Sequence, residues 1–325
     1  MTTLKTTILT TWIVTVLLCS ALLAQRPRIL DSWRAQNERY SRELPEEVPD
    51  MAFNGWICPG TEGSWADVNN WSLGIVPIST HNVAFGSWSQ ASVVAGFNQT
   101  GVDLASLWTQ PEYGGHIGTS ANSLLIDSTK VTHEGSGLLH LKFDGHGGRV
   151  LIDSPNRMQA AILDGTASTC WINVKRGVVE LAAGLSEVDV LNVSFHSSPG
   201  DDAIVTIPTS ANTLGQVAIN GGLVVNYRDI VDSGAGQEGV LSMGCGQLYM
   251  EGTSAAERVY VHGGHLINNS TGTFGVTTLL GGTCDATQKP GTRAMTIIRI
   301  FEGAEFYSSD LVTKTIYDYR NNAER

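Results

Sequence analysis

Positive charge is scarce in this sequence. The 325 residues include 20 lysines and arginines against 31 aspartates and glutamates, which gives a formal net charge of −11 at pH 7. No stretch of the chain concentrates its basic residues. Because phosphate backbones are bound by concentrated basic faces, the sequence argues against a nucleic-acid partner. The acidic balance also disfavours anionic membranes and anionic polysaccharides, unless a cation mediates the contact.

Charge of either sign is low, and so is helical periodicity. Charged residues make up 16 % of the chain and hydrophobic residues 42 %. This argues against a disordered protein, because disorder goes with low hydrophobicity and high net charge. After Met51 the apolar residues show no long helical period. They fall in short alternating or β-branched runs between glycine, asparagine, serine and threonine, which is the pattern of strands and turns.

Cysteine is sparse, with five in the chain. Cys19 lies in an apolar N-terminal stretch, whereas Cys58, Cys170, Cys245 and Cys284 are widely spaced and form no C-x-x-C pair. This spacing argues against structural zinc, and we expect neither a metal nor a cofactor. An even number of cysteines in an exported chain permits disulfides, but four isolated buried thiols fit the spacing better.

The N-terminus has the pattern of an export signal. Lys5 precedes an uncharged apolar stretch from Ile8 to Ala24, and small residues at Ala21 and Ala24 suit signal peptidase. Residues 1–24 are therefore predicted to be a signal peptide, which would leave the mature chain secreted or at a cell surface and free of the membrane. The alternative is a retained membrane anchor, for which about 17 residues would be short.

Residues 25–50 differ from the rest of the chain. Five residues recur there at spacings of three and four, on one face of a predicted helix: Leu30, Trp33, Asn37, Tyr40 and Leu44. Pro45 would end this helix. We expect a short helical stalk or linker that packs on its own domain. The alternative is an oligomerisation seam with the polar Asn37 inside it, so a homo-oligomer stays open.

A repeat decides the fold class. Four segments share the form strand, glycine, strand: 217–227, 241–251, 259–269 and 277–287. Their aligned glycines, Gly222, Gly246, Gly264 and Gly282, are 24, 18 and 18 residues apart. A period of this size without helices predicts a single-stranded parallel β-solenoid over 91–325, with one coil per repeat. A β-sandwich or Greek-key barrel would not explain the recurrence at 18.

The glycines of this repeat are predicted to sit at sharp corners between two strands. There the backbone needs a positive φ, or stacked backbones approach closely.

The segment 51–90 is rich in tryptophan and precedes the first predicted coils. It contains the stretch GSWADVNNWSLGIVP, residues 63–77. A solenoid has open ends that must be covered. We therefore expect an N-terminal cap formed by Trp56, Trp65 and Trp71, together with Trp88. The alternative is a carbohydrate-binding platform in which the indole faces of Trp65 and Trp71 stack on sugar rings.

The pattern G-x-W-x5-W-x-x-G-x-x-P in this stretch, followed by glycine-punctuated strand repeats, resembles the start of bacterial secreted and surface β-helix proteins. It is also similar to phage tail-spike and fibre proteins of the same architecture. The resemblance covers about Gly55 to the C-terminus. It implies a right-handed parallel β-helix with a role in surface structure or attachment, and it carries over no catalytic residue.

Many enzymes on this fold cleave acidic polysaccharides. Polygalacturonase-like hydrolases carry N-T-D, then D-D, then G-H-G, then R-I-K along the chain. Here GHG at 145–147 precedes GDD at 200–202, N-T-D is absent, and Arg299-Ile300 lacks the following lysine. Because order along a solenoid fixes the coil that each residue occupies, this does not favour a hydrolase, which needs two carboxyl groups around one bond.

A lyase would need carboxylates that bind calcium. Asp127 and Asp153 have similar contexts and could lie on neighbouring coils, but each directly follows an aliphatic run, as turn aspartates do. If the chain is an enzyme, the candidate residues are Asp127, Asp153, Asp201 and Asp202; otherwise no catalytic residue is expected. In the histidine-rich segment 131–148, alternation places Leu139, Leu141 and Phe143 inside and His140 outside.

These observations predict an exported structural or adhesive surface protein that is more consistent with binding than with catalysis. Its expected partner is an extracellular polysaccharide or a surface protein. One alternative is a polysaccharide lyase or glycoside hydrolase on a β-helix. Another is a virion tail-spike or fibre, which would form a tight trimer. The fold class alone does not decide between these functions.

Overall fold

The computed structural model describes residues 53–320, apart from 120, 146, 167–169, 187, 195–201, 232–238, 290 and 310–311. The predicted signal peptide (1–24) and helical segment (25–50) lie outside the described residues. Among those that are described, the only helix is the short 3-10 helix η1, Val68–Asn70. No helix there is long and apolar enough to cross a membrane. The described chain is nearly all β-structure, as predicted.

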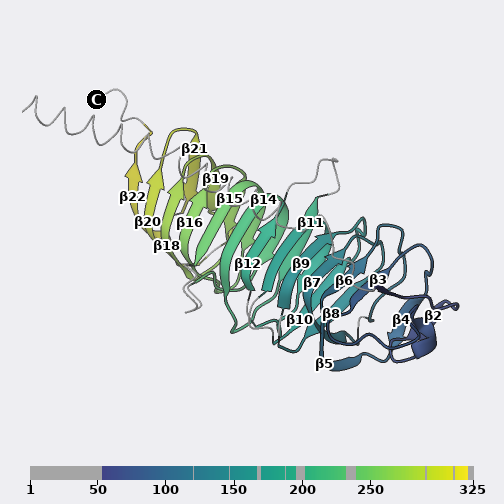
Figure 1. Ribbon diagram of the computed structural model, residues 1–325. Helices are drawn as coiled ribbons and strands as arrows, with labels where there is room; N and C mark the ends of the chain where they lie inside the picture. Colours follow the sequence, from purple (N-terminus) through teal and green to yellow (C-terminus); the bar gives the residue numbers. More distant parts are fainter. Residues whose placement is uncertain are drawn as a thin grey trace, which may run out of the picture. The chain divides into compact units, whose positions relative to one another are not determined.

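The strands stack in parallel as successive coils of a solenoid (Figure 1). On the first face, each coil places one strand directly on the strand of the coil before it. This face contains whole strands or parts of the following: β1 (Phe53–Gly55), β3 (Asn82–Phe85), β6 (Ser106–Thr109), β7 (Leu124–His133), β9 (Gly147–Asp153), β11 (Cys170–Leu181), β12 (Val188–Val193), β14 (Leu214–Asn226), β15 (Val240–Met250), β16 (Ala256–Val261), β18 (Thr273–Leu279), β20 (Arg293–Ile300) and β22 (Val312–Asp318).

The second face is built in the same way. Its strands are β2 (Glu62–Ser64), β4 (Ser92–Ala95), β8 (Leu139–Phe143), β10 (Ala161–Gly165), β13 (Ala203–Ile207), β17 (His265–Asn268), β19 (Gly282–Ala286) and β21 (Ala304–Ser308), with the second halves of β11, β14 and β15. The remaining strand, β5 (Asn98–Leu104), pairs with the first half of β7, which also pairs with β8. The isolated bridge Leu214↔Ile230 lies at the start of the first face, where Leu214 also pairs with Val188.

Long strands turn the corners between faces. In β14, Val217 pairs with Leu191 on the first face, while Val224 pairs with Val205 on the second. The pairing with β15 shifts between these two parts, at Asn220. The parallel β-solenoid predicted from the repeat is therefore confirmed. Its right-handed sense stays a prediction.

The 18-residue spacing of the corner glycines equals the length of one coil. Leu241, Val259 and Thr277 pair in succession across three coils, so each coil there is 18 residues long. At the corner, Gly264 has φ +77° and Gly282 has φ +68°. A Cβ on Gly264 would lie 2.6 Å from the carbonyl oxygen of Gly246, closer than such atoms approach. Both predicted reasons for glycine, a positive φ and close backbone stacking, hold at this corner.

The core is a single column that follows the coils. In β13, Ala203, Val205 and Ile207 are buried, whereas Ile204 and Thr206 between them are exposed. This alternation repeats from coil to coil, because side chains of a strand point to opposite faces. The predicted alternation in β8 is also found, since Leu139, Leu141 and Phe143 are fully buried.

Two arginines lie inside this column, which the sequence did not predict. Arg228 is fully buried and donates hydrogen bonds of 2.5–3.3 Å to the carbonyl oxygens of Ala182, Leu185 and Pro208. Arg293 is nearly as buried and donates to the carbonyl oxygens of Ala286 and Lys289. A buried charge needs hydrogen-bond partners. Here the partners are carbonyl groups at corners, where strand pairing is interrupted.

Candidate functional site

The three tryptophans of the predicted cap fill the core of the first coils. Trp56, Trp65 and Trp71 are 0–1 % exposed. The ring centroids of Trp65 and Trp71 are 4.7 Å apart and those of Trp56 and Trp71 are 5.0 Å apart, in edge-to-face contact. Phe85 packs against all three rings. This aromatic cluster closes the core near the N-terminus, as predicted.

Hydrogen bonds fix the rings of this cluster. The indole N–H of Trp71 donates to the carbonyl oxygen of Trp65 at 2.7 Å, and that of Trp56 donates to the carbonyl oxygen of Ala91 at 2.9 Å. Sugar stacking requires an indole face in contact with water. The buried rings of Trp65 and Trp71 offer none, so the geometry gives no support to carbohydrate binding at these two residues.

Trp88 was predicted to be part of the cap, but it is not. Its side chain is 49 % exposed and lies outside the buried cluster. Together with Phe53 and Ile57, each 43 % exposed, it lines a groove of about 360 Å³ on the outer side of the first face. The other lining residues are Gly55, Ser72, Ala84, Trp108 and Gln110. We call this the aromatic groove.

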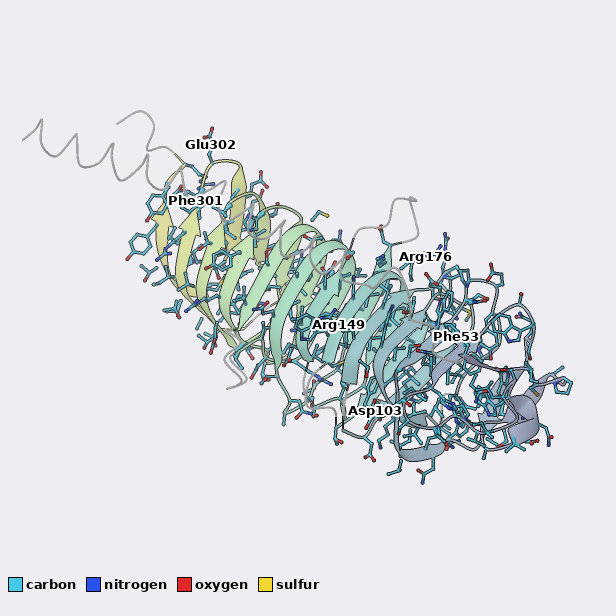
Figure 2. All side chains as sticks on the ribbon, viewed as in Figure 1. Phe53, Asp103, Arg149, Arg176, Phe301 and Glu302 are labelled. Carbon is cyan, nitrogen blue, oxygen red and sulfur yellow. The ribbon has the colours of Figure 1, made fainter. Side chains whose placement is uncertain are left out.

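The floor of the aromatic groove follows from strand register. Gly55 pairs with Ala84, and Ala84 pairs with Trp108, so three successive coils place these residues in one outward row. Gly55 and Ala84 are small and leave the space of the groove open, and the side chain of Trp108 bounds this space. Figure 2 places Phe53 at the opposite end of the solenoid from Phe301 and Glu302. The groove therefore belongs to the N-terminal end of the solenoid.

The walls of the groove are held in place. The indole N–H of Trp108 donates to Oε2 of Glu134 at 2.9 Å. A Cβ on Gly86 would lie 2.4 Å from both the ring of Trp88 and Oε1 of Gln110, so only glycine leaves room for their packing. A groove with aromatic walls and a few polar groups is the usual composition of a small-ligand site.

The three candidate carboxylates that the structure describes, Asp127, Asp153 and Asp202, do not form a site. Oδ1 of Asp127 accepts hydrogen bonds from the backbone N–H groups of Asp144, at 2.8 Å, and Gly145, at 3.1 Å. Asp153 forms an ion pair with Nε of Arg176 at 3.1 Å. Asp202 is exposed just before β13. Asp201 lies outside the described residues.

Asp127 and Asp153 are also far apart along the coil. Ser128 pairs with Gly147, and His133 pairs with Ile152, in the same strand pair. Asp127 therefore precedes one end of this pairing, and Asp153 follows the other. Asp127 was predicted to be a turn aspartate that bonds its own backbone, but it lies within β7 and accepts hydrogen bonds from backbone N–H groups of the next coil, which corrects the prediction. Within the described residues, no three metal-ligating side chains cluster.

Two histidines of the histidine-rich segment 131–148 are covered by other groups. His140 lies on the outer side of β8 but is only 9 % exposed, because its Nδ1 lies 2.5 Å from the carbonyl oxygen of Thr119. His133 is buried, and its Nδ1 lies 2.6 Å from Oγ1 of Thr109. Burial lowers the pKa of His133 to about 4, so the ring is neutral at pH 7. His146 lies outside the described residues.

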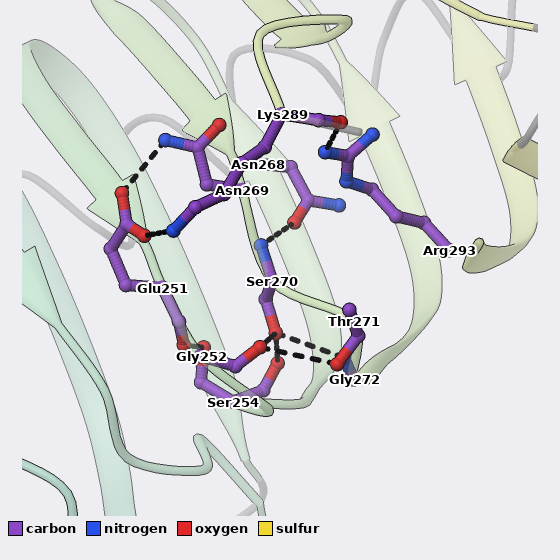
Figure 3. A network of polar contacts seen from close by, with 10 residues as sticks. All are labelled: Glu251, Gly252, Ser254, Asn268, Asn269, Ser270, Thr271, Gly272, Lys289 and Arg293. Atoms are coloured by element: carbon purple, nitrogen blue, oxygen red, sulfur yellow. Dashed lines mark hydrogen bonds and ion pairs between the residues drawn. The ribbon is translucent and has the colours of Figure 1, made fainter. Parts of the chain in front are cut away.

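A polar network joins the corners of three coils (Figure 3). Glu251 accepts hydrogen bonds from Asn269 at 2.7 Å and Lys289 at 2.5 Å. Burial opposes ionisation of Glu251, but these two bonds outweigh it and lower its pKa. Oγ of Ser270 donates to the carbonyl oxygen of Ser254 at 2.6 Å. Most polar atoms of this network bond one another, which fits a structural role better than a ligand site, whereas Oδ1 of Asn269 and Nδ2 of Asn268 are buried without a partner among the described residues.

The four cysteines of the predicted mature chain are free thiols. Cys58, Cys170 and Cys284 are buried as expected, whereas Cys245 is exposed, which corrects the prediction of four buried thiols. Burial raises the pKa of Cys170 and of Cys284 to about 12. The thiols of Cys170 and Cys284 are therefore unreactive at pH 7, and the structure places no disulfide among the four cysteines.

Comparison with family models, curated proteins and solved structures finds no match for this chain. What the chain does is therefore inferred from its own residues. Of the features described above, the aromatic groove alone combines exposed ring faces with a shaped space. Sequence reasoning missed Phe53, Trp108 and Gln110 there, because the early coils do not show the 18-residue repeat.

Proposed function

We propose that the chain is an exported structural or adhesive protein of a cell surface, and that it holds a neutral sugar chain in the aromatic groove. The observation that carries this proposal is the exposed ring of Trp88, which lines the same groove as Trp108. A large exposed apolar surface on a soluble protein marks a binding site. Indole rings offer an apolar face to the C–H side of a sugar while a polar edge stays hydrated.

Polar groups at the groove and the charge of the chain narrow the ligand class. Gln110 and Ser72 line the groove and can hydrogen-bond sugar hydroxyls. Glu134 bonds the indole of Trp108, and the whole chain has a net charge of −11. An acidic polymer would be repelled by this field. A neutral polysaccharide fits these groups better.

Catalysis is less well supported than binding. Glycosidases need two carboxyl groups positioned around one bond. Asp127 and Asp153 lie at opposite ends of one strand pairing and are engaged in hydrogen bonds or an ion pair. The resemblance to β-helix surface proteins and tail-spikes is consistent with attachment. A virion fibre would differ from a cellular adhesin by forming a tight trimer.

The test uses the mature chain from Gln25 to Arg325 with neutral and acidic polysaccharides, with and without calcium. Retention is measured together with new reducing ends and the absorbance of unsaturated products. We expect retention on a neutral polymer without cleavage. Trp88→Ala should weaken retention roughly tenfold or more, which corresponds to about 1.4 kcal/mol of binding free energy. Its control is Tyr307→Ala, since Tyr307 is 50 % exposed and lies in β21.

Two results would contradict this proposal. Equal retention of the Trp88→Ala and Tyr307→Ala variants would remove the sugar site from the groove. Cleavage of any polymer would replace the adhesive function with an enzymatic one. In that case Asp127, Asp153, Asp201 and Asp202 would be the first residues to substitute.

A further inference from the structure

Among the described residues, none covers the core at the C-terminal end of the solenoid. Ile316 in β22 pairs with the fully buried Ile298 and occupies the same inner position, yet it is 43 % exposed. Tyr317 beside it is 47 % exposed, and Tyr319 is 40 % exposed. At the other end the aromatic cluster fills this inner position. An inner hydrophobic side chain that no described residue covers indicates a surface that binds something.

Within the described part of the chain, β22 pairs with β20 along one edge, and no strand pairs with its other edge. The N–H of Tyr319 donates to the carbonyl oxygen of Ile300, so Tyr319 points toward β20. Backbone groups of alternate residues point to opposite edges of a strand. Ile316 and Asp318 therefore direct their N–H and C=O groups away from β20. Such an edge is a template for another strand.

The side chains of β22 fit a second copy of the same strand. If two β22 strands pair antiparallel around Ile316, each Ile316 faces the other. Lys314 of one copy then faces Asp318 of the other. Opposite charges directly across an antiparallel pair are stabilising. All three residues align with core positions of β20, namely Met295, Ile298 and Ile300, so the pairing would continue the core.

The charges of this strand already have local partners that permit the pairing. The Nζ atom of Lys314 lies 3.3 Å from the carbonyl oxygens of both Ser309 and Val312, which are long hydrogen bonds. Asp318 forms an exposed ion pair with Arg320 at 2.5 Å. Arg320 donates to both carboxylate oxygens of Asp318, so a lysine of the partner would share these oxygens through their remaining lone pairs. An inward lysine at an edge can alternatively serve to prevent pairing.

We propose that the C-terminal end is a two-fold interface at which β22 strands of two copies pair antiparallel around Ile316. This proposal rests on the fold and does not depend on the sugar site. A head-to-tail stack is a poorer fit, because the aromatic cluster already closes the core of the N-terminal end. The dimer leaves the aromatic groove of each copy at an outer end.

A cysteine cross-link tests this geometry directly. In the mature chain with Cys245→Ser, which removes the exposed thiol, Ile316→Cys places two cysteines opposite each other in the dimer. Residues of a hydrogen-bonded antiparallel pair have Cα atoms about 5.5 Å apart, within the range for a disulfide. We expect most of this variant to become a covalent dimer under mild oxidation. The control is the exposed Thr313→Cys, whose two copies would lie roughly 20 Å apart.

A charge swap gives a second test. Lys314→Glu and Asp318→Lys each place like charges opposite one another, and each should raise the dimer Kd at least tenfold. The double variant restores opposite charges and should recover dimerisation, as measured by light scattering. A monomer at all concentrations would overturn the proposal, including one in which the chain's own ends cover Ile316. Equal cross-linking of the two cysteine variants would also overturn it.

Discussion

At the scale of single residues, the glycine corners separate two causes of strain. Gly264 has φ +77° and meets the backbone of the preceding coil. Gly303 has φ +82°, but a Cβ there would meet nothing within 4 Å. The two positions therefore share the left-handed conformation and differ in the available space.

This pair gives the first prediction. Gly303→Ala should lower the free energy of unfolding by about 1 kcal/mol, the cost of the left-handed backbone alone. Gly264→Ala should cost roughly 2 kcal/mol more, because the coils must move apart. Denaturant unfolding of both variants measures the difference. Equal losses would mean that close stacking does not matter at this corner.

His133 gives a dependence on pH. Its pKa is about 4 in the folded chain and 6.5 ordinarily, so the unfolded state binds the proton more tightly. The stabilising contribution of neutral His133 is complete above pH 6.5 and is lost as the pH falls toward 4. The loss is about 3 kcal/mol over this range.

The measurement for His133 is the free energy of unfolding against pH. His133→Gln should flatten the slope between pH 6.5 and 4, whatever its stability at pH 7. His265→Gln, at a half-buried histidine, is the control and should retain the slope. An unchanged slope in the His133 variant would assign the acid sensitivity to other groups.

The corner glycines could be predicted from the sequence, but the two buried arginines could not. The glycine corners were predictable, because spacing and backbone chemistry both point to them. Arg228 and Arg293 were not, because an isolated arginine in a sequence predicts a surface residue. Their burial depends on which carbonyl groups the folded corners leave unpaired, and no local pattern records that.

At the scale of elements, the tryptophans of the cap are buried, whereas Trp88 in the aromatic groove is half exposed. Trp65→Ala or Trp71→Ala should lower the free energy of unfolding by about 3–5 kcal/mol, because each removes a fully buried ring from the core. Trp88→Ala should change stability by less than about 1 kcal/mol, since half of that ring is exposed. Thermal and denaturant unfolding check both expectations. Similar losses at Trp65 and Trp88 would contradict the division between cap and groove.

The sequence predicted this division only in part. Clustered tryptophans before the first coil indicated a cap, and Trp56, Trp65 and Trp71 fill the core. The groove needs the register Gly55↔Ala84↔Trp108 across coils. Those early coils differ in length from the 18-residue coils, so their alignment could not be read from spacing. The exposed position of Trp88 was missed for the same reason.

At the scale of the whole molecule, the equal coils make the solenoid modular. Leu241, Val259 and Thr277 stack on the first face, and Leu248, Leu266 and Cys284 stack on the second. Deleting residues 259–276 should bring Thr277 onto Leu241 with every inner position kept. The shortened chain should fold with a cooperative transition, as followed by circular dichroism. Deleting nine residues instead should prevent folding, because core positions would then turn outward.

Such a deletion would shorten the solenoid by one strand spacing, about 4.8 Å. The number of coils therefore sets the distance between the aromatic groove and the C-terminal end of the solenoid. In a tail-to-tail dimer, each coil gained or lost would change the distance between the two grooves by about 10 Å. A ligand with repeating units could bind both grooves at once only if the spacing of its units matched the distance between the grooves. That distance would change in steps of about 10 Å. Coil number, rather than any side chain, would then tune the avidity of the dimer.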